Sequence, residues 1–258
     1  MSAQILVFAG QKGGVGKTTS AMNLGAAFHK SGARVLLVDL APQGNLTTAA
    51  GVTLTDETPT VYEVLKGDVP AERAIVSHEG LDVLPADDQL ALIEVEYSGQ
   101  IGREFLLSRA LRSVRDSYDW IMIDCAGGFG LLTMNGLTAA TAYIATLWTE
   151  HHAFRSVDSL FQVAGQVAEY VNPGLVFAGY LPTRYNASKK QHARILAAVN
   201  ARAEEEGVAV LPTIRENIAL DEACAAGQSI FTFRPQAHAA EDYQAVADAL
   251  AKQVKARG

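Results

Sequence analysis

A glycine-rich segment near the start of the chain, GQKGGVGKTT from Gly10 to Thr19, restricts the possible folds more than any other feature. It follows an apolar run at residues 5–9, which predicts a buried strand, and leads into residues 18–30, whose spacing predicts a helix. A glycine turn between a strand and a helix points backbone N–H groups and the positive helix end at one place, which suits an anion. The segment therefore predicts a phosphate-binding loop within an α/β fold.

The residue types within this loop indicate nucleotide binding. Lys17 is placed to reach the β- and γ-phosphates, and the Thr18 hydroxyl is placed to act as a Mg²⁺ ligand. The common pattern G-x-x-x-x-G-K-[ST] is not met, because its first glycine would fall at Gln11; the chain has K-G-G-x-G-K-T-T, with an additional lysine at Lys12. A glycine turn with a solvated lysine is the alternative, and the strand and helix around the loop argue against it. The expected nucleotide contacts are Lys12, Gly13, Gly14, Val15, Gly16, Lys17, Thr18 and Thr19.

Short apolar runs alternate with longer segments of helical period, which predicts a mainly parallel sheet flanked by helices. The predicted strands are residues 5–9, 35–39, 81–85, 120–124, 142–147 and 175–181, with a shorter one near 208–211. The predicted helices are residues 18–30, 88–97, 103–117, 154–171, 189–205 and 238–255. We expect residues 1–258 to form one domain, with its ligand site at the carboxyl ends of the strands.

Composition argues against several other classes of protein. Cys125 and Cys224 lie far apart without zinc-type spacing, so a reducing cytoplasm is expected rather than a disulfide framework or a structural metal. The first residues lack the basic region of a signal peptide and predict a first strand instead, and no apolar run approaches the ~20 residues that would span a bilayer. The net charge is −7, but from Tyr180 onward ten Lys and Arg outnumber nine Asp and Glu. The net charge does not suggest a nucleic-acid binder, and any DNA-facing surface is expected in the last third of the chain.

The motif K-G-G-x-G-K-T-T at residues 12–19 resembles the deviant Walker A motif of the ParA/MinD family of ATPases. In that family the equivalent of Lys12 reaches across a dimer to the partner's phosphates, as an arginine finger does, and such a cation is worth roughly 10³–10⁵ in rate. The similarity covers nearly the whole chain. It continues through residues 94–96, 102–104, Glu150, residues 182–183 and residues 214–223.

The residues after the second predicted strand resemble the family's D-x-D-P-Q-G-N switch segment. Asp39 matches the first acid, which the resemblance places near Mg²⁺ or the attacking water and groups with Lys12 and Lys17 as a catalytic residue. Ala41 stands where the family has a second aspartate, which helps to position or activate the water. Its absence is expected to slow hydrolysis while leaving nucleotide binding largely intact. A deliberate substitution that traps the ATP state and a natural loss are both open.

A strand that ends in an acid, YDWIMIDC from Tyr118 to Cys125, resembles the family's Walker B segment. Asp124 is expected to hold Mg²⁺ through water, because Mg²⁺ keeps several waters and takes few protein carboxylates. A carboxylate that caps the following helix is the structural alternative, and the phosphate loop favours the metal role. Residues 126–128 read A-G-G where the family usually has P-P, which predicts a more flexible switch.

The last third of the chain is expected to contact the base and DNA. Residues 214–223 resemble the family's adenine-side loop, so Arg215 and Asn217 are candidate base contacts, with a surface ion pair as the alternative for Arg215. DNA binding in this family is independent of sequence and is made by scattered cations, each of which could instead be a solvated charge. The candidates are Arg184, Lys189, Lys190, Arg194, Arg202 and Arg234.

The resemblance implies a ParA-type partition ATPase with weak ATP hydrolysis and with ATP and Mg²⁺ as cofactors. It also implies a homodimer formed with ATP, nonspecific binding to double-stranded DNA and a ParB-like activator protein. A cytoplasmic, nucleoid-associated location without stable membrane association follows. A MinD-like or cargo-positioning ATPase is one alternative. A metabolic or redox enzyme of the nitrogenase iron-protein type is another, although Cys125 and Cys224 do not supply its paired cluster cysteines, and the adjacent His151 and His152 are poorly spaced to share a metal.

Overall fold

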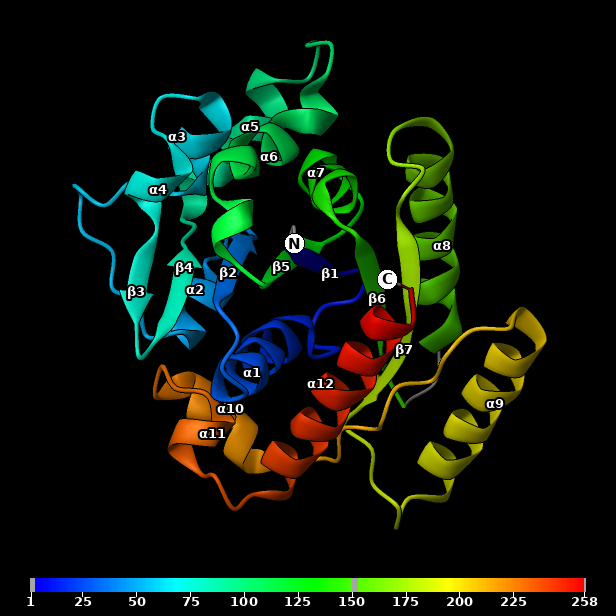
Figure 1. Cartoon of the computed structure of the whole chain (residues 1–258). Coiled ribbons are helices and arrows are strands. Elements are labelled where there is room, and N and C mark those ends of the chain that lie inside the picture. Colours follow the sequence, from blue (N-terminus) through cyan, green and yellow to red (C-terminus); the bar gives the residue numbers. More distant parts are fainter. Residues whose placement is uncertain (1–2, 150–152, 258) are drawn as a thin grey trace.

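The computed structural model describes residues 3–149 and 153–257, and it consists of a sheet with helices on both faces (Figure 1). In this part of the chain the sheet has seven strands in the order β3-β4-β2-β5-β1-β6-β7, and each neighbouring pair is parallel except β3 with β4. The strands are β1 Gln4–Gly10, β2 Val35–Leu40, β3 Val76–His78, β4 Leu81–Leu84, β5 Trp120–Gly127, β6 Ala142–Trp148 and β7 Val176–Thr183. The predicted fold class, a mainly parallel sheet flanked by helices, is confirmed.

The central strands are apolar along their length because helices cover both of their faces. β2 reads VLLVDL and all six of its residues are buried, and β1 is buried from its second residue to its last. Parallel strands of this kind carry continuous apolar runs instead of the alternation of a half-exposed strand. Asp39 is the single acid of β2, so its carboxyl group is buried among apolar side chains and requires hydrogen-bond partners there.

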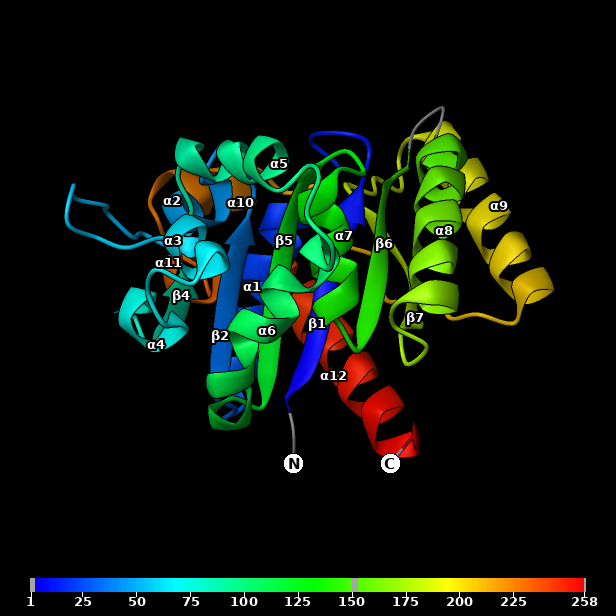
Figure 2. The ribbon, with the colours of Figure 1, turned by 90° about the horizontal axis from the view of Figure 1, so that it is seen from above.

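The helices divide between the two faces of the sheet (Figure 2). Side chains of α1, α10, α11 and α12 share one apolar core, and those of α3, α6, α7, α8 and α9 share the other. On the first face α12 packs against α1, where Ser20 Oγ and Tyr243 Oη lie 3.2 Å apart in a buried hydrogen bond. The helices are α1 Lys17–Lys30, α2 Asn45–Ala49, α3 Val61–Lys66, α4 Ala71–Ala74, α5 Leu92–Glu96, α6 Leu106–Ala110, α7 Leu131–Ala139, α8 Ala153–Tyr170, α9 Lys190–Glu206, α10 Ile218–Ala225, α11 Ile230–Phe233 and α12 His238–Arg257.

The strand predicted near residues 208–211 is wrong. Val210 forms one isolated parallel bridge with Tyr180, supported by backbone bonds from Tyr180 N to Ala209 O and from Leu211 N to Tyr180 O. Pro212 follows directly and has no N–H to donate, so the pairing cannot extend as a regular ladder.

Two predicted helices are broken into short pieces. Residues 88–97 form a 3₁₀ turn followed by α5, and residues 103–117 form α6 between 3₁₀ turns. The second break has a visible cause: Asn135 of α7 accepts from Leu107 N over 3.0 Å and donates to the Arg103 carbonyl over 2.9 Å. A continuous α-helix would join these two backbone groups to each other, so the Asn135 side chain replaces that bond.

Among the helices of residues 3–149 and 153–257, none is long and apolar enough to cross a membrane. Glu150, His151 and His152 lie outside the described residues.

Candidate functional site

The loop between β1 and α1 lies at the edge of the sheet toward which β2 points (Figure 2). Gly14 and Gly16 have φ values of 73° and 88°, left-handed values that glycine adopts without steric cost. No side chain caps the N-terminus of α1 at Gly16, so the first N–H groups of the helix are open to an anion. The Thr183 hydroxyl, at the end of β7, donates to the Val15 carbonyl over 2.9 Å and fixes the loop against the sheet.

The two lysines of the loop occupy different environments. The Lys17 side chain is buried, and its ammonium donates to the Lys12 carbonyl oxygen over 3.1 Å. Burial lowers the pKa of Lys17, and the charge of Asp124 opposes this shift. The Lys12 side chain is exposed, and its Nζ lies 5.2 Å from the centre of the Trp148 ring. Lys17 is thus part of the lining of the site, whereas Lys12 lies at its surface.

Thr18 and Asp124 meet where β1, β2 and β5 end. The Thr18 hydroxyl donates to Asp124 Oδ2 over 2.6 Å, while the buried Asp124 Oδ1 has no hydrogen-bond partner among the described residues. Burial, together with the charge of Asp39, which pairs with Asp124 in the register of β2 and β5, raises the pKa of Asp124 to about 8. A hydroxyl beside an unpartnered carboxylate oxygen fits Mg²⁺, which prefers oxygen ligands and few protein carboxylates.

Asp39 lies beside Asp124 in the register of β2 and β5, and its oxygens are hydrogen-bonded within the switch segment. Its Oδ1 accepts from Ala41 N over 3.1 Å, and its Oδ2 accepts from both Thr47 N and Thr47 Oγ1 over 2.8 Å. The side chain is fully buried and is absent from the lining of the cavity described next. Burial raises the pKa of Asp39 to about 6, and the Thr47 bonds oppose the shift. Its oxygens therefore hold the switch segment in shape, and its place near Mg²⁺ or the attacking water stays a prediction.

A cavity of about 690 Å³ lies over the loop. Ala41 lines it and presents a methyl group at the position where the sequence lacks the second acid. The cavity is bounded by the loop, the switch segment, the end of β5 and the end of α10. Its lining residues are Gly13, Gly14, Gly16, Lys17, Thr18, Thr19, Ala41, Gln43, Asn45, Thr48, Ala49, Asp124, Cys125, Gly127, Arg184, Cys224 and Ala225.

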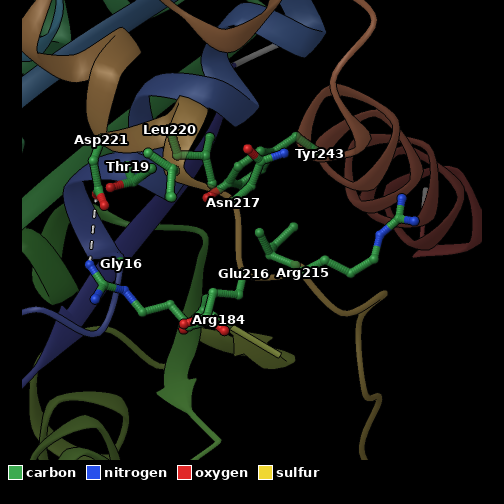
Figure 3. Close-up of a pocket in the computed structure, with 12 residues that line it drawn as sticks. Gly16, Thr19, Arg184, Arg215, Glu216, Asn217, Leu220, Asp221 and Tyr243 are labelled. Atoms are coloured by element: carbon green, nitrogen blue, oxygen red, sulfur yellow. Dashed lines mark ion pairs between the residues drawn. The ribbon is translucent and has the colours of Figure 1, made fainter. Parts of the chain in front are cut away.

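A smaller cavity of about 110 Å³ adjoins the first and shares Gly16, Thr19 and Arg184 with it (Figure 3). Arg184 and Asp221 form an ion pair of 3.8 Å at its rim. The two cavities together extend from the glycine loop to residues 214–221.

The two candidate base contacts diverge at this smaller cavity. Figure 3 shows the Arg215 side chain running toward α12, where its Nη2 lies 2.6 Å from Asp242 and 3.2 Å from Glu241. These are the ion pairs that the sequence analysis gives as the alternative for Arg215, which also lines the smaller cavity. Asn217 lies at the cavity, and its Oδ1 accepts from Ala219 N over 3.0 Å, which caps α10.

Most of the predicted DNA-contacting cations are engaged with acidic side chains. Within residues 3–149 and 153–257, Lys190 and Arg194 form no ion pair, and both are exposed on α9. The engaged cations pair as Arg184 with Asp221, Lys189 with Glu216, Arg202 with Asp158 and Glu206, and Arg234 with Glu222.

Two residues of the site had not been singled out from the sequence. Thr47 belongs to the switch segment, and its hydroxyl both donates to Asp39 and accepts from Ala86 N over 2.9 Å. Its position within a recognised motif was a usable signal. Trp148 contacts Lys12 and Arg184, and nothing in the local sequence indicates that role.

Together, the sheet order, the glycine loop between β1 and α1 and the Thr18–Asp124 pair define a P-loop nucleotide-binding protein. Residues 3–177 match a family described as an AAA domain. The chain is 37% identical over 257 residues to the sporulation initiation inhibitor protein Soj of Bacillus subtilis, covering 99% of each chain. It is 36% identical to the chromosome partitioning protein ParA of Caulobacter vibrioides, covering 89% of this chain and 87% of that one. The chain belongs to the ParA (Soj) family of P-loop ATPases.

A solved structure extends the comparison to a bound nucleotide. The structure of a protein named cobyrinic acid a,c-diamide synthase from Mycobacterium smegmatis, with ADP and magnesium, is 37% identical. It covers 99% of this chain and 97% of that chain, with a TM-score of 0.85.

Proposed function

We propose that this chain binds ATP with Mg²⁺ and acts as a ParA-type partition ATPase, with residues 1–258 serving as one ATPase domain. The observation that carries the proposal is the difference in exposure between the two lysines of the loop: Lys17 is buried in the site, and Lys12 is exposed. A buried lysine is suited to the nucleotide of its own subunit, and an exposed one is suited to a second subunit. Similarity to proteins named Soj and ParA over most of the chain supports the same conclusion.

In this proposal, different residues of the site bind the phosphates, the base and the Mg²⁺ ion. The open N–H groups of α1 and the Lys17 ammonium receive the phosphates, and the smaller cavity receives the base. Thr18 and Asp124 would hold Mg²⁺, which neutralises charge on the phosphates. Asp39 and Thr47 hold the switch segment against the end of β4 through the bond to Ala86.

Ala41 is the residue that limits hydrolysis in this proposal. It lines the larger cavity with a methyl group where a carboxylate would position or activate water. Removing a group of that kind typically costs about 10²–10⁴ in rate. The ATP-bound form is therefore long-lived, whether the substitution is engineered or natural.

The consequences for assembly follow from Lys12. With ATP, two subunits close face to face, each offering Lys12 to the other, and the dimer binds double-stranded DNA without sequence preference. A ParB-like protein then stimulates hydrolysis and release. The protein is cytoplasmic and nucleoid-associated in this scheme, and the replicon that it serves is a plasmid or a chromosome.

The test is the oligomeric state measured by light scattering with ADP and with ATP, alongside retention on duplex DNA over a range of salt concentrations. We expect monomers with ADP, dimers with ATP, and ATP-dependent retention that weakens steeply as salt rises. Equal retention without nucleotide, or none at any salt concentration, contradicts the proposal. Co-sedimentation with liposomes in ATP would instead favour a MinD-like ATPase.

A second candidate rests on the 37% identity to the structure named cobyrinic acid a,c-diamide synthase. An amide synthase of that kind would consume ATP when supplied with cobyrinic acid and an amino-group donor. ATP turnover that responds to those compounds, and not to DNA with a partner protein, would establish the second candidate in place of the first.

A further inference from the structure

Two cations from separate loops lie against one aromatic ring, and one of them, Arg184, lines the larger cavity. Lys12 Nζ is 5.2 Å from the centre of the Trp148 ring, and the Arg184 guanidinium carbon is 5.0 Å from it. The order of the sheet explains the meeting: β6 ends at Trp148 and lies between β1, which leads into the loop of Lys12, and β7, which leads into Arg184. All three residues follow or end neighbouring parallel strands.

Arg184 is held in an uncommon backbone conformation at this point. Its φ is 51°, in the left-handed region that residues other than glycine seldom occupy, and such a conformation persists where the surroundings hold it. The Trp148 ring and the Asp221 carboxylate, 3.8 Å away, are the contacts that hold its side chain. Arg184 also lines both cavities, so the ring contacts a residue of the candidate nucleotide site.

We propose that Trp148 is a positioning residue that retains Lys12 on its own subunit and thereby sets how readily this lysine is offered to a second subunit. The negative face of an indole attracts an ammonium group, and indole does so more strongly than a phenyl ring. Lys12 is otherwise exposed, so the ring is a defined place for a side chain that would be free to turn in solvent. To reach the phosphates of a partner subunit, Lys12 must give up this contact.

The inference rests on the proposed ATP-dependent dimer and makes a quantitative addition to it. An exposed contact of this type favours the retained position by about two- to fivefold. Because both subunits must give up this contact, loss of the ring should strengthen nucleotide-driven dimerisation by about the square of this factor, roughly four- to twenty-five-fold. If Trp148 only filled space or formed part of the dimer interface, its removal would leave dimerisation unchanged or weaken it.

The first experiment tests the contact itself through fluorescence. The chain has two tryptophans, and Trp120 is buried in a stack with Phe28 at 3.9 Å, so Trp120→Phe leaves Trp148 as the single emitter. In that background Lys12→Gln should shift or intensify the Trp148 emission. Lys30→Gln is the matched control, because Lys30 lies over Phe231 at 5.1 Å and should leave the emission unchanged. An unchanged spectrum in Lys12→Gln would overturn the contact.

The second experiment measures dimer affinity by sedimentation velocity with Mg²⁺ and AMPPNP, after melting curves have shown that each variant folds. We expect affinity to rise in the order wild type, Trp148→Phe, Trp148→Ala, with Trp120→Phe behaving as wild type. Unchanged or weaker dimerisation of Trp148→Ala would overturn the retaining role. If no protein in the series dimerises, the proposed function fails, and the fluorescence comparison still decides whether Trp148 holds Lys12.

Discussion

The Thr18 hydroxyl donates to Asp124 Oδ2 over 2.6 Å and leaves the second carboxylate oxygen, which is buried, without a partner among the described residues. Such an oxygen carries an unpaid desolvation cost unless a donor or a cation reaches it. The pair is therefore the part of the site whose chemistry depends most on Mg²⁺.

Replacing Asp124 should weaken ATP binding chiefly when Mg²⁺ is present. Asp124→Asn is expected to weaken ATP binding in Mg²⁺ by roughly tenfold or more, and to change it little in EDTA, because the loop and Lys17 remain. Titration with a fluorescent ATP analogue in each buffer measures both values. Asp119→Asn, which alters the exposed pair with Arg34, is the control and should not change the Mg²⁺ effect. Equal losses in both buffers would mean that Asp124 supports the loop and not the metal.

Restoring the missing acid should restore turnover. Ala41→Asp places a carboxylate at the wall of the larger cavity, and we expect ATP hydrolysis to rise on the order of 10²-fold. Phosphate release under saturating ATP is the measurement, with Ala41→Asn as the neutral control of similar size. Similar rates for all three proteins would show that another group handles the water.

The buried Thr47 side chain, which is hydrogen-bonded to Asp39, should contribute more to the free energy of unfolding than the side chain of its exposed neighbour Thr48. Thr47→Val leaves the Asp39 carboxylate and the Ala86 N–H short of a partner, so the free energy of unfolding should fall by about 1–3 kcal/mol. Thr48→Val on the exposed side of α2 should change it by less than about 0.5 kcal/mol. Urea denaturation compares the two, and equal effects would contradict the assignment.

Glu94 of α5 should stabilise the start of α7. Its Oε1 accepts from Leu132 N over 3.4 Å, and a Cβ on Gly130 would overlap its carboxylate. Glu94→Ala should cost about 0.3–1 kcal/mol by removing negative charge from a helix N-terminus. Gly130→Ala should displace the same carboxylate, so the two changes together should cost less than their sum in urea denaturation. Strict additivity would show that the residues act independently.

Lys190 and Arg194, which form no ion pair with the residues that the structure describes, should contribute more to DNA binding than the paired cations. Lys190→Gln and Arg194→Gln are each expected to weaken retention by ATP-bound protein and to lower the salt slope by about one. Lys189→Gln and Arg202→Gln are the controls, because Glu216 already engages Lys189, and Asp158 and Glu206 engage Arg202. Larger effects in the controls would place the DNA surface elsewhere.

The sequence predicted the larger elements because their signals are local. Strand β1, the loop and α1 follow one another within thirty residues, and the apolar runs of β2, β5 and β6 reveal strands buried on both faces. The short helices were missed, although Thr60 and Glu63 form a capping box that announces α3. The break before α6 could not have been predicted, because Asn135, which causes it, is 28 residues from Leu107.

The sequence motifs indicate which residues of the candidate site lie together, whereas the hydrogen-bond and ion-pair partners of some of these residues could not be predicted. Thr18 and Asp124 meet as expected, since parallel strands bring their carboxyl ends together. The resemblance predicts that Asp39 lies near Mg²⁺ or the attacking water, which stays a prediction, and its bonds from Thr47 could not be foreseen because they depend on how the switch segment folds back. Arg215 is drawn to Asp242, 27 residues away on α12, which no local pattern reveals.

The buried bond between Ser20 and Tyr243 ties the first helix of the chain to the last one. Because α1 starts at the phosphate loop, the geometry of that loop depends on residues more than two hundred positions further along. A deletion that removes α12 would strip the outer cover from α1 and loosen nucleotide binding without touching any residue of the motif. Fluorescent fusions for imaging should accordingly leave the whole of α12 intact.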